Sequence, residues 1–170
     1  MFESLVSIAV LVGISVLVVL LSDRIESLKY NWRNPPEKQA AERARHFQRL
    51  SAPDWSFYER HLERKAPEPL RELFANLELV QAPLAIKDLN IYISQFEPLD
   101  MEGLIDSKEW LGIEIVPFAD SDGDLIYLKP GATIDDAVYI TYHDGGDTEE
   151  LVSDVAKFVR HVREARAKTI

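Results

Sequence analysis

Residues 113–128 read IEIVPFADSDGDLIYL, two apolar runs on either side of a turn rich in Asp and Gly. Short apolar runs bounded by such a turn are typical of strands, and Gly and Asp tolerate the positive φ that a tight turn requires. The sequence therefore predicts a β-hairpin with strands over 113–118 and 125–128, joined by a turn over 120–124.

Further strands are predicted on both sides of this hairpin. Leu89, Ile91 and Ile93 alternate with less apolar neighbours, which predicts a half-buried strand that extends to Phe96. Residues 137–142, AVYITY, predict another strand, because their apolar side chains also repeat every second residue.

Helical patterns precede and follow these strands. Residues 51–54, SAPD, combine a cap residue, a first-turn proline and an acid, which predicts a helix start with Ser51 as the cap. A second helix is predicted after Pro67 or Pro69, and a third from residues 148–150, TEE. The expected inward-facing residues are Trp55, Tyr58, Leu62, Leu70, Leu73, Phe74, Leu77, Leu151, Val155, Phe158, Val159 and Val162. The fold class is therefore α+β, an antiparallel sheet flanked by helices, which we expect on one face of the sheet.

The N-terminal segment is the most apolar part of the chain. From Leu5 to Leu21 there is no charged residue, and a helix of this length spans about 25 Å, close to the thickness of a bilayer core. We predict a transmembrane helix; a buried core helix and a cleaved secretory signal are the alternatives. A signal peptide is disfavoured because residues 1–3 contain no Lys or Arg.

The charges beside this segment predict its orientation. Basic residues follow it, at Arg24, Lys29 and Arg33 among others, whereas Glu3 is the only charged side chain before it. The positive-inside rule then places the C-terminal part in the cytoplasm, so we expect a single-pass protein of the cell (inner) membrane. The predicted organisation is an anchor and juxtamembrane helix over 1–33, a polar linker helix over 34–50, and one domain over 51–170.

Charge is distributed unevenly along that domain. Between residues 88 and 154 there are seventeen Asp and Glu against two Lys, a balance of −15, whereas the whole chain carries −10. Such a segment disfavours nucleic acid and favours a basic protein partner, although acids that only solubilise the domain are an alternative. The chain contains no Cys, which excludes disulfides, thiolate metal sites and cysteine nucleophiles.

Several of these segments resemble the SUKH superfamily, the domains of Smi/Knr type. Residues 115–120, IVPFAD, followed by 123–128, GDLIYL, resemble the family's apolar-Pro-Phe strand, its Asp and Gly turn and its Gly-Asp strand. Residues 137–144, AVYITYHD, resemble its next strand with a terminal His-Asp, and 66–74, APEPLRELF, resemble its early helix. The likeness covers residues 52–163 and implies a protein-binding domain without enzymatic activity. In bacteria, domains of this family often act as immunity proteins against toxins, including nucleases.

The residue patterns of common enzymes give little support to catalysis. The chain has no P-loop, no dinucleotide fingerprint and no nucleophile elbow. Asp120, Asp122 and Asp124 resemble the opening of a calcium loop, but its sixth and twelfth positions are Leu125 and Gly131 instead of Gly and a carboxylate. His143 beside Asp144 is a weak acid/base candidate, since neighbouring residues on a strand point to opposite faces.

We therefore expect no catalytic residue, no bound metal, no cofactor and no small-molecule substrate. The candidate partner-binding residues are Asp120, Asp122, Asp124, Asp144 and Asp147. The expected function is a membrane-anchored protein-interaction domain, with immunity against a basic toxin domain as one possibility. A scaffold or regulator of envelope assembly at the cytoplasmic membrane face is the alternative, and a hydrolase or metal-binding enzyme is a third hypothesis.

Overall fold

The computed structural model describes residues 35–112, 114–131, 136–144 and 146–168. The predicted transmembrane segment, from Leu5 to Leu21, lies outside the described residues. Of the helices within the described ranges, none combines the length and apolar character that crossing a bilayer requires.

Helix α2 (Pro36–Leu50) crosses the boundary between two units of the chain, residues 1–45 and 46–170. In the first unit the side chains of α2 are largely exposed, and Lys38 forms an ion pair with Glu42, one turn further on, at 3.8 Å. In the second unit Leu50 is buried in the core. The last residue of α2 is therefore part of the folded core, whereas the sequence predicted a solvated linker up to residue 50.

The two predicted short helices are α3 (Trp55–Leu62) and α4 (Glu68–Ala75). The cap of α3 is Asp54, which accepts a hydrogen bond from the backbone N–H of Phe57 at 2.9 Å, and not the predicted Ser51. Pro69 lies in the first turn of α4, where its missing N–H costs no helical hydrogen bond. The predicted apolar stripes are confirmed, with these residues buried: Tyr58, Leu62, Leu70, Leu73 and Phe74.

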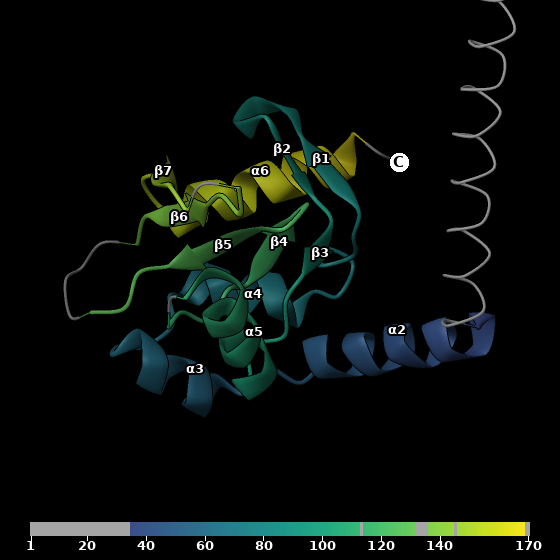
Figure 1. The fold of residues 1–170 in the computed structure, drawn as a ribbon. Coiled ribbons are helices and arrows are strands. Elements are labelled where there is room, and N and C mark those ends of the chain that lie inside the picture. The colour runs from purple at the N-terminus through teal and green to yellow at the C-terminus, as the bar shows by residue number, and fades with distance from the viewer. Residues whose placement is uncertain (1–34, 113, 132–135, 145, 169–170) are drawn as a thin grey trace, which may run out of the picture. The chain divides into compact units, whose positions relative to one another are not determined.

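The strands of the described residues form two antiparallel sheets (Figure 1). One is a pair, β1 (Leu84–Ile86) with β2 (Ile91–Ile93), joined by the 3-10 turn η1 (Lys87–Leu89). The other has five strands in the order β3 (Gln95–Phe96), β4 (Ala119–Ser121), β5 (Asp124–Leu128), β6 (Val138–Thr141) and β7 (Thr148–Val152).

A hairpin forms here as β4 and β5, and the second predicted strand, 125–128, is confirmed in β5. The first predicted strand, 113–118, is wrong: the described residues 114–118 form no strand, and β4 contains Asp120 and Ser121, of which Asp120 was predicted to lie in the turn. Pro117 has no N–H for a sheet hydrogen bond, and the first donor after it is the Phe118 N–H, which reaches the Ile126 carbonyl at 2.9 Å. The predicted strand from Leu89 to Phe96 is divided into β2 and β3, because the chain passes from one sheet to the other at Ser94.

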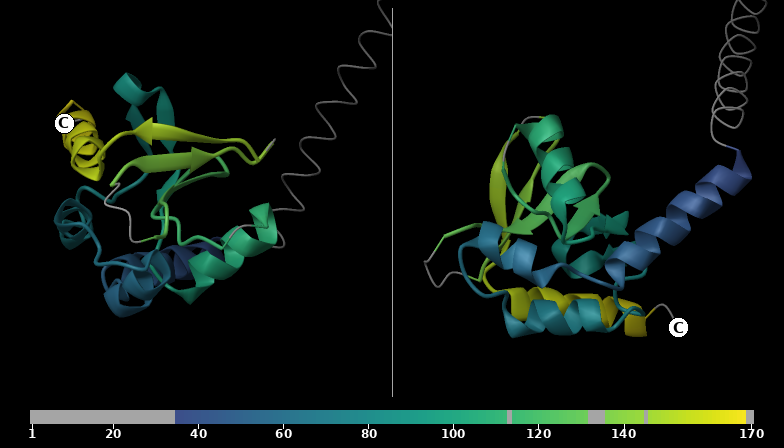
Figure 2. Two further views of the ribbon diagram at one scale, coloured as in Figure 1. Left: turned by 90° about the vertical axis from the view of Figure 1, so that its left-hand side faces the viewer. Right: turned by 90° about the horizontal axis from the view of Figure 1, so that it is seen from below.

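The core lies on one face of the five-stranded sheet, against helix α6 (Val155–Ala167). Every second strand residue points to this face and is buried: Phe96, Ala119, Ile126, Leu128, Val138 and Ile140. The predicted stripe of α6 covers them with Val155, Phe158, Val159 and Val162, and the rings of Phe118 and Phe158 meet edge to face at 5.4 Å. Helix α4 lies beside α6 in both views of Figure 2.

Two predictions about helices are wrong. Thr148, Glu149 and Glu150 do not open the last helix; they form β7, and α6 begins seven residues later at Val155, capped by Asp154. Helix α5 (Met101–Leu111) was not predicted. It lies toward the face of the sheet that carries Leu125, which points away from the core, so helices cover both faces and not one (Figure 1).

Candidate functional site

Two tight turns bring the five predicted partner-binding aspartates to one end of the five-stranded sheet. Ser121 pairs with Asp124 at the β4–β5 turn, and Leu125 pairs with Thr141 on β6, so the β6–β7 turn lies at the same end. We call this end, defined by the following residues, the acidic end: Asp120, Asp122, Asp124, Asp144 and Asp147. The sequence predicted the residues, and strand pairing brings them together.

The β4–β5 turn depends on two residues with positive φ. Asp122 has φ 55° and Gly123 has φ 99°, the combination that a two-residue hairpin turn requires. A Cβ atom on Gly123 would lie 3.4 Å from the ring of His143, so the two turns lie next to each other. The acidic end is thus formed by closely packed turns.

His143 links these two turns through its contact with Asp124. The acid/base hypothesis had paired His143 with its neighbour Asp144 instead. The Asp124 carboxylate accepts hydrogen bonds from His143 Nδ1 at 2.7 Å and from its backbone N–H at 3.0 Å. The hydrogen bond to Asp124 raises the pKa of His143 above its usual 6.5. The two hydrogen bonds from His143 therefore fix one carboxylate of the acidic end in place.

The carboxylate of Asp120 is held by the adjacent strand and turn. It accepts hydrogen bonds from the Ser94 hydroxyl and from the Gly123 N–H, the latter at 3.2 Å. The Asp122 N–H in turn donates to Ser94 Oγ at 3.2 Å. Because these donors are part of the folded chain, the Asp120 carboxylate is oriented before another protein binds.

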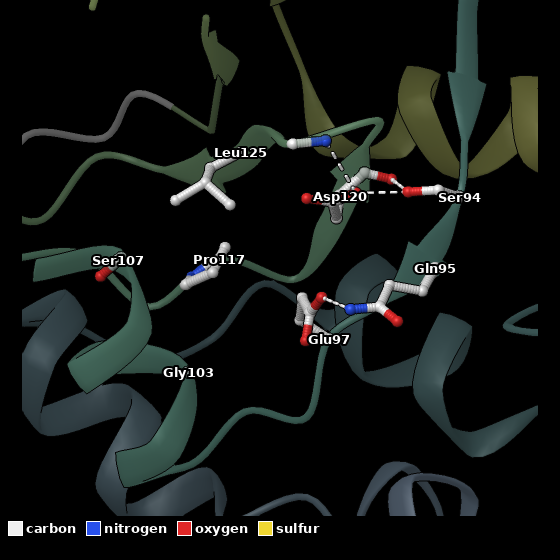
Figure 3. Close-up of a pocket in the computed structure, with 9 residues that line it drawn as sticks. Ser94, Gln95, Glu97, Gly103, Ser107, Pro117, Asp120 and Leu125 are labelled. Atoms are coloured by element: carbon white, nitrogen blue, oxygen red, sulfur yellow. Dashed lines mark hydrogen bonds between the residues drawn. The ribbon is translucent and has the colours of Figure 1, made fainter. Parts of the chain in front are cut away.

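A pocket of about 420 Å³ opens next to the acidic end, between β3, β4, β5 and α5 (Figure 3). One side is largely apolar and includes Leu125, Pro117 and the backbone of Gly103, whereas Asp120 lies on the opposite side. The lining residues on the polar side are Ser94, Gln95, Glu97 and Asp120. The pocket therefore offers apolar contact and negative charge together.

The sequence did not identify Gln95 or Glu97 as site residues. The Gln95 amide donates a hydrogen bond to the Glu97 carboxylate, and Gln95 is the register partner of Asp120 on β4. This long-range pairing brings the residues together. There was little indication of this role in the sequence, because Glu97 is one of seventeen acidic residues between positions 88 and 154.

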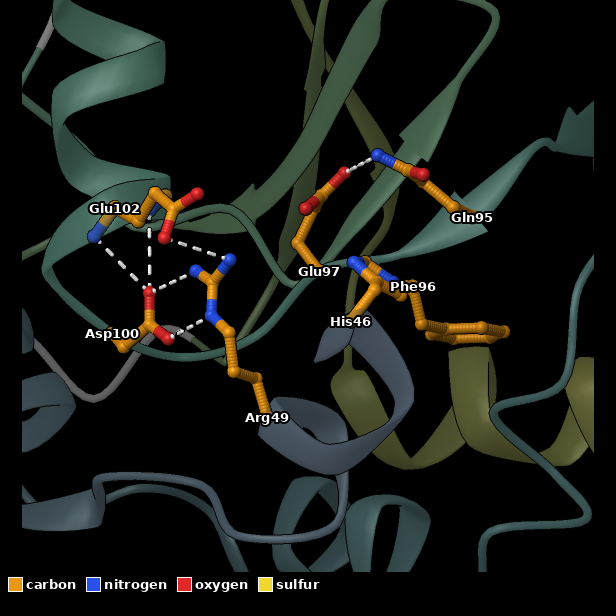
Figure 4. A network of polar contacts seen from close by, with 8 residues as sticks. His46, Arg49, Gln95, Phe96, Glu97, Asp100 and Glu102 are labelled. Carbon is orange, nitrogen blue, oxygen red and sulfur yellow. Dashed lines mark hydrogen bonds and ion pairs between the residues drawn. The ribbon is translucent and has the colours of Figure 1, made fainter. Parts of the chain in front are cut away.

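Two further acids of the same segment are neutralised within the fold (Figure 4). Arg49, near the end of α2, donates from Nε and Nη2 to Asp100 at 2.8 and 2.6 Å, and its Nη1 lies 2.9 Å from Glu102. Burial opposes ionisation of Asp100, but the hydrogen bond and charge of Arg49 outweigh it and hold the pKa of Asp100 below its usual 3.8. These two acids therefore support the fold and are not part of the acidic end.

One group of side chains in the described part of the chain has the composition of a metal site. Asp88, His161 and Glu164 each offer a ligand atom, and these atoms lie within 4.8 Å of one another. Asp88 also lies 4.0 Å from the ammonium group of Lys168 and 3.9 Å from His161 Nδ1. The ammonium group of Lys168 therefore already supplies positive charge beside this carboxylate.

Taken together, the acidic end and its pocket can accept hydrogen bonds and hold positive charge. Their carboxylates are oriented by neighbouring donors, and the pocket adds apolar surface. The arrangement suits recognition of basic side chains. No protein-family model matches the chain, and neither a curated protein nor a solved structure gives a significant match.

Proposed function

We propose that this chain is a non-enzymatic protein-interaction domain that binds a basic segment of another protein through the acidic end. The observation that carries the proposal is the convergence of five aspartates at one end of the sheet, where they lie in two adjacent turns or in the strand residues next to them. Such turns at the end of a rigid sheet are well placed to contact a partner.

The charges of the surrounding segment support this proposal. The two lysines between residues 88 and 154 are engaged away from the five aspartates: Lys108 pairs with Glu114, and Lys129 lies 3.7 Å from the centre of the Tyr139 ring. Neither lysine therefore pairs with a carboxylate of the acidic end. A partner with complementary charge would be steered to it, and its association rate would fall as salt is added.

The predicted N-terminal anchor gives this interaction a location. A transmembrane helix from Leu5 to Leu21 would hold the domain at the cytoplasmic face of the cell membrane. Confinement to that surface raises the local concentration of the domain for any partner that enters through the membrane or resides in it.

The resemblance to SUKH domains supports a more specific role. The mixed α+β fold with antiparallel sheets and a closing helix is compatible with that likeness. We propose that the chain is an immunity protein that neutralises a basic toxin domain by covering its active surface. Scaffolding of envelope assembly is the alternative role, and a toxin gene or an envelope gene adjacent to this one would separate the two.

The test is affinity capture with the full-length chain in a mild detergent, compared with two triple variants. One variant neutralises the acidic end: Asp122→Asn, Asp144→Asn and Asp147→Asn. The control removes the same charge from exposed sites elsewhere: Glu63→Gln, Glu68→Gln and Glu78→Gln. We expect basic proteins to be retained at low salt, with at least tenfold less retained by the acidic-end variant and unchanged retention by the control. Equal retention by all three proteins would contradict the proposal.

A further inference from the structure

We propose that the pocket beside the acidic end receives one arginine or lysine side chain from the basic segment that the domain binds. This inference rests on the proposed function and names the group recognised. The pocket is lined by β3, β4, β5 and α5, and Asp120 and Gly123 belong both to its wall and to the β4–β5 hairpin. A peptide bound over that turn would therefore lie at the mouth of the pocket.

The two sides of the pocket match the two parts of a long basic side chain. Leu125 and Pro117 provide apolar surface on one side, and Asp120 and Glu97 provide carboxylates on the other (Figure 3). Arg and Lys pack their aliphatic stems on apolar surface and keep the charged group among polar atoms. An uncharged side chain would fill the space without matching the negative charge on the polar side.

The carboxylates of the pocket are oriented by hydrogen bonds from neighbouring donors. Asp120 accepts from Ser94 and Gly123, and Glu97 accepts from the amide of Gln95. An ionised carboxylate has about four lone-pair sites for hydrogen bonds and can accept two from one guanidinium group. The same chemistry occurs within this fold, where Arg49 binds Asp100 through two nitrogens.

The pocket has room for one long basic side chain, and its walls are held by the fold. Its volume is about 420 Å³, which is within the range of small-molecule sites of about 300–1,000 Å³ and larger than one arginine side chain. Ser107 is 1% exposed and its hydroxyl lies 2.6 Å from the Ile115 carbonyl, which fixes the α5 wall. At Gly103, a Cβ atom would lie 3.2 Å from the Pro98 carbonyl, so this wall is closely packed. A preformed pocket lowers the entropic cost of binding.

The test measures fluorescence anisotropy with the full-length chain in a mild detergent and two labelled probe peptides. Both peptides have nine residues and two flanking lysines, and they differ only at the centre, which is arginine in one and its neutral analogue citrulline in the other. We expect the wild-type protein to bind the arginine peptide about tenfold more tightly than the citrulline peptide.

Two variants change the pocket in different ways. Glu97→Gln removes one charge from its wall, and Leu125→Trp fills its apolar side without changing charge. Glu150→Gln, on the exposed part of β7, is the matched control for loss of one charge. We expect the preference for arginine to fall below twofold in both pocket variants and to stay near tenfold in the control.

The outcomes separate this inference from the proposed function. If both pocket variants keep the tenfold preference while the Asp122, Asp144 and Asp147 triple variant loses binding, the inference is overturned and the proposed function stands. If the wild-type protein binds neither peptide at low salt, both are overturned. Loss of the preference in both pocket variants, with the control unchanged, supports the pocket as the site of the basic side chain.

Discussion

Arg49 and Asp100 form a two-point ion pair that joins the end of α2 to the first turn of α5 (Figure 4). Asp100 is also the cap of α5, because its carboxylate accepts the N–H of Glu102 at 3.1 Å. One carboxylate thus anchors two helices that are far apart in the sequence. The arginine matters for its planar geometry as well as its charge, since lysine cannot make both hydrogen bonds in the same way.

Replacing this arginine should lower the stability of the domain. We expect Arg49→Lys to reduce the free energy of unfolding by about 1–2 kcal/mol, because charge-assisted hydrogen bonds of a half-buried pair are lost. Urea unfolding of the full-length chain, followed by tryptophan fluorescence, measures this change. Arg163→Lys is the control, since Arg163 pairs with Glu72 at an exposed site and should cost at most about 0.5 kcal/mol. Equal losses in both variants would contradict the role of Arg49.

The pKa values of two histidines should be shifted in opposite directions from the usual 6.5. The hydrogen bond to Asp124 raises the pKa of His143, whereas burial lowers the pKa of His46, whose Nε2 donates to the Phe96 carbonyl at 2.9 Å. NMR titration of histidine-labelled protein should place His143 above 6.5 and His46 below it. Asp124→Asn should return His143 toward 6.5 and leave His46 unchanged.

The raised pKa of His143 determines how its bond to Asp124 makes the stability of the fold depend on pH. The contribution of the His143–Asp124 bond to stability is fully present below the unfolded-state pKa of about 6.5 and is lost as pH rises through the higher folded-state value. The measurement compares the stability of the wild-type protein with that of Asp124→Asn as the pH rises from about 6.5. If the difference in favour of the wild-type protein increased with pH, the raised pKa of His143 would be contradicted.

Two buried tyrosines should respond differently to loss of their hydroxyl groups. Tyr58 is 1% exposed, and its hydroxyl makes no hydrogen bond within the described residues; burial raises its pKa well above the usual 10. Tyr127 OH lies 3.1 Å from Thr141 Oγ1. We expect Tyr58→Phe to raise the free energy of unfolding by about 1 kcal/mol and Tyr127→Phe to lower it by about 1 kcal/mol. Urea unfolding of both variants measures these values, and a loss in Tyr58→Phe would show that its hydroxyl has a partner.

The predicted anchor can be tested by cell fractionation. We expect the full-length chain in the membrane pellet after washing at alkaline pH, because a transmembrane helix is not released by loss of electrostatic contacts. Deletion of residues 1–33 should move the protein to the soluble fraction. Recovery of the full-length chain in the soluble fraction would contradict the anchor.

Local sequence patterns predicted the elements whose formation depends on near neighbours. The β4–β5 hairpin was found from Asp122 and Gly123, whose positive φ values suit the turn, and the α6 stripe from its helical spacing. Helix α5 was missed because its apolar residues do not form one buried stripe: Met101 and Ile105 are 53% and 46% exposed. The helix is capped by Asp100, which is hard to recognise as a cap among the many acids between residues 88 and 154.

Long-range pairing explains the remaining differences. Thr148 and the two glutamates after it have the composition of a helix start, but they pair with β6 and form β7. At the candidate site, the aspartates could be chosen from the sequence, whereas the pocket could not. Gln95 faces Asp120 only because β3 joins β4, across 25 positions of the chain.

The exposed glutamates of β7 have a consequence for self-association. β7 is an open edge of the five-stranded sheet, and Glu149 and Glu150 are exposed along it. Two copies aligned edge to edge would bring these like charges together, which disfavours the strand addition that leads to aggregation. The opposite edge, β3, is two residues long and offers little backbone for such pairing. The fold therefore protects both margins of its sheet, so many copies can be crowded together without joining into larger sheets.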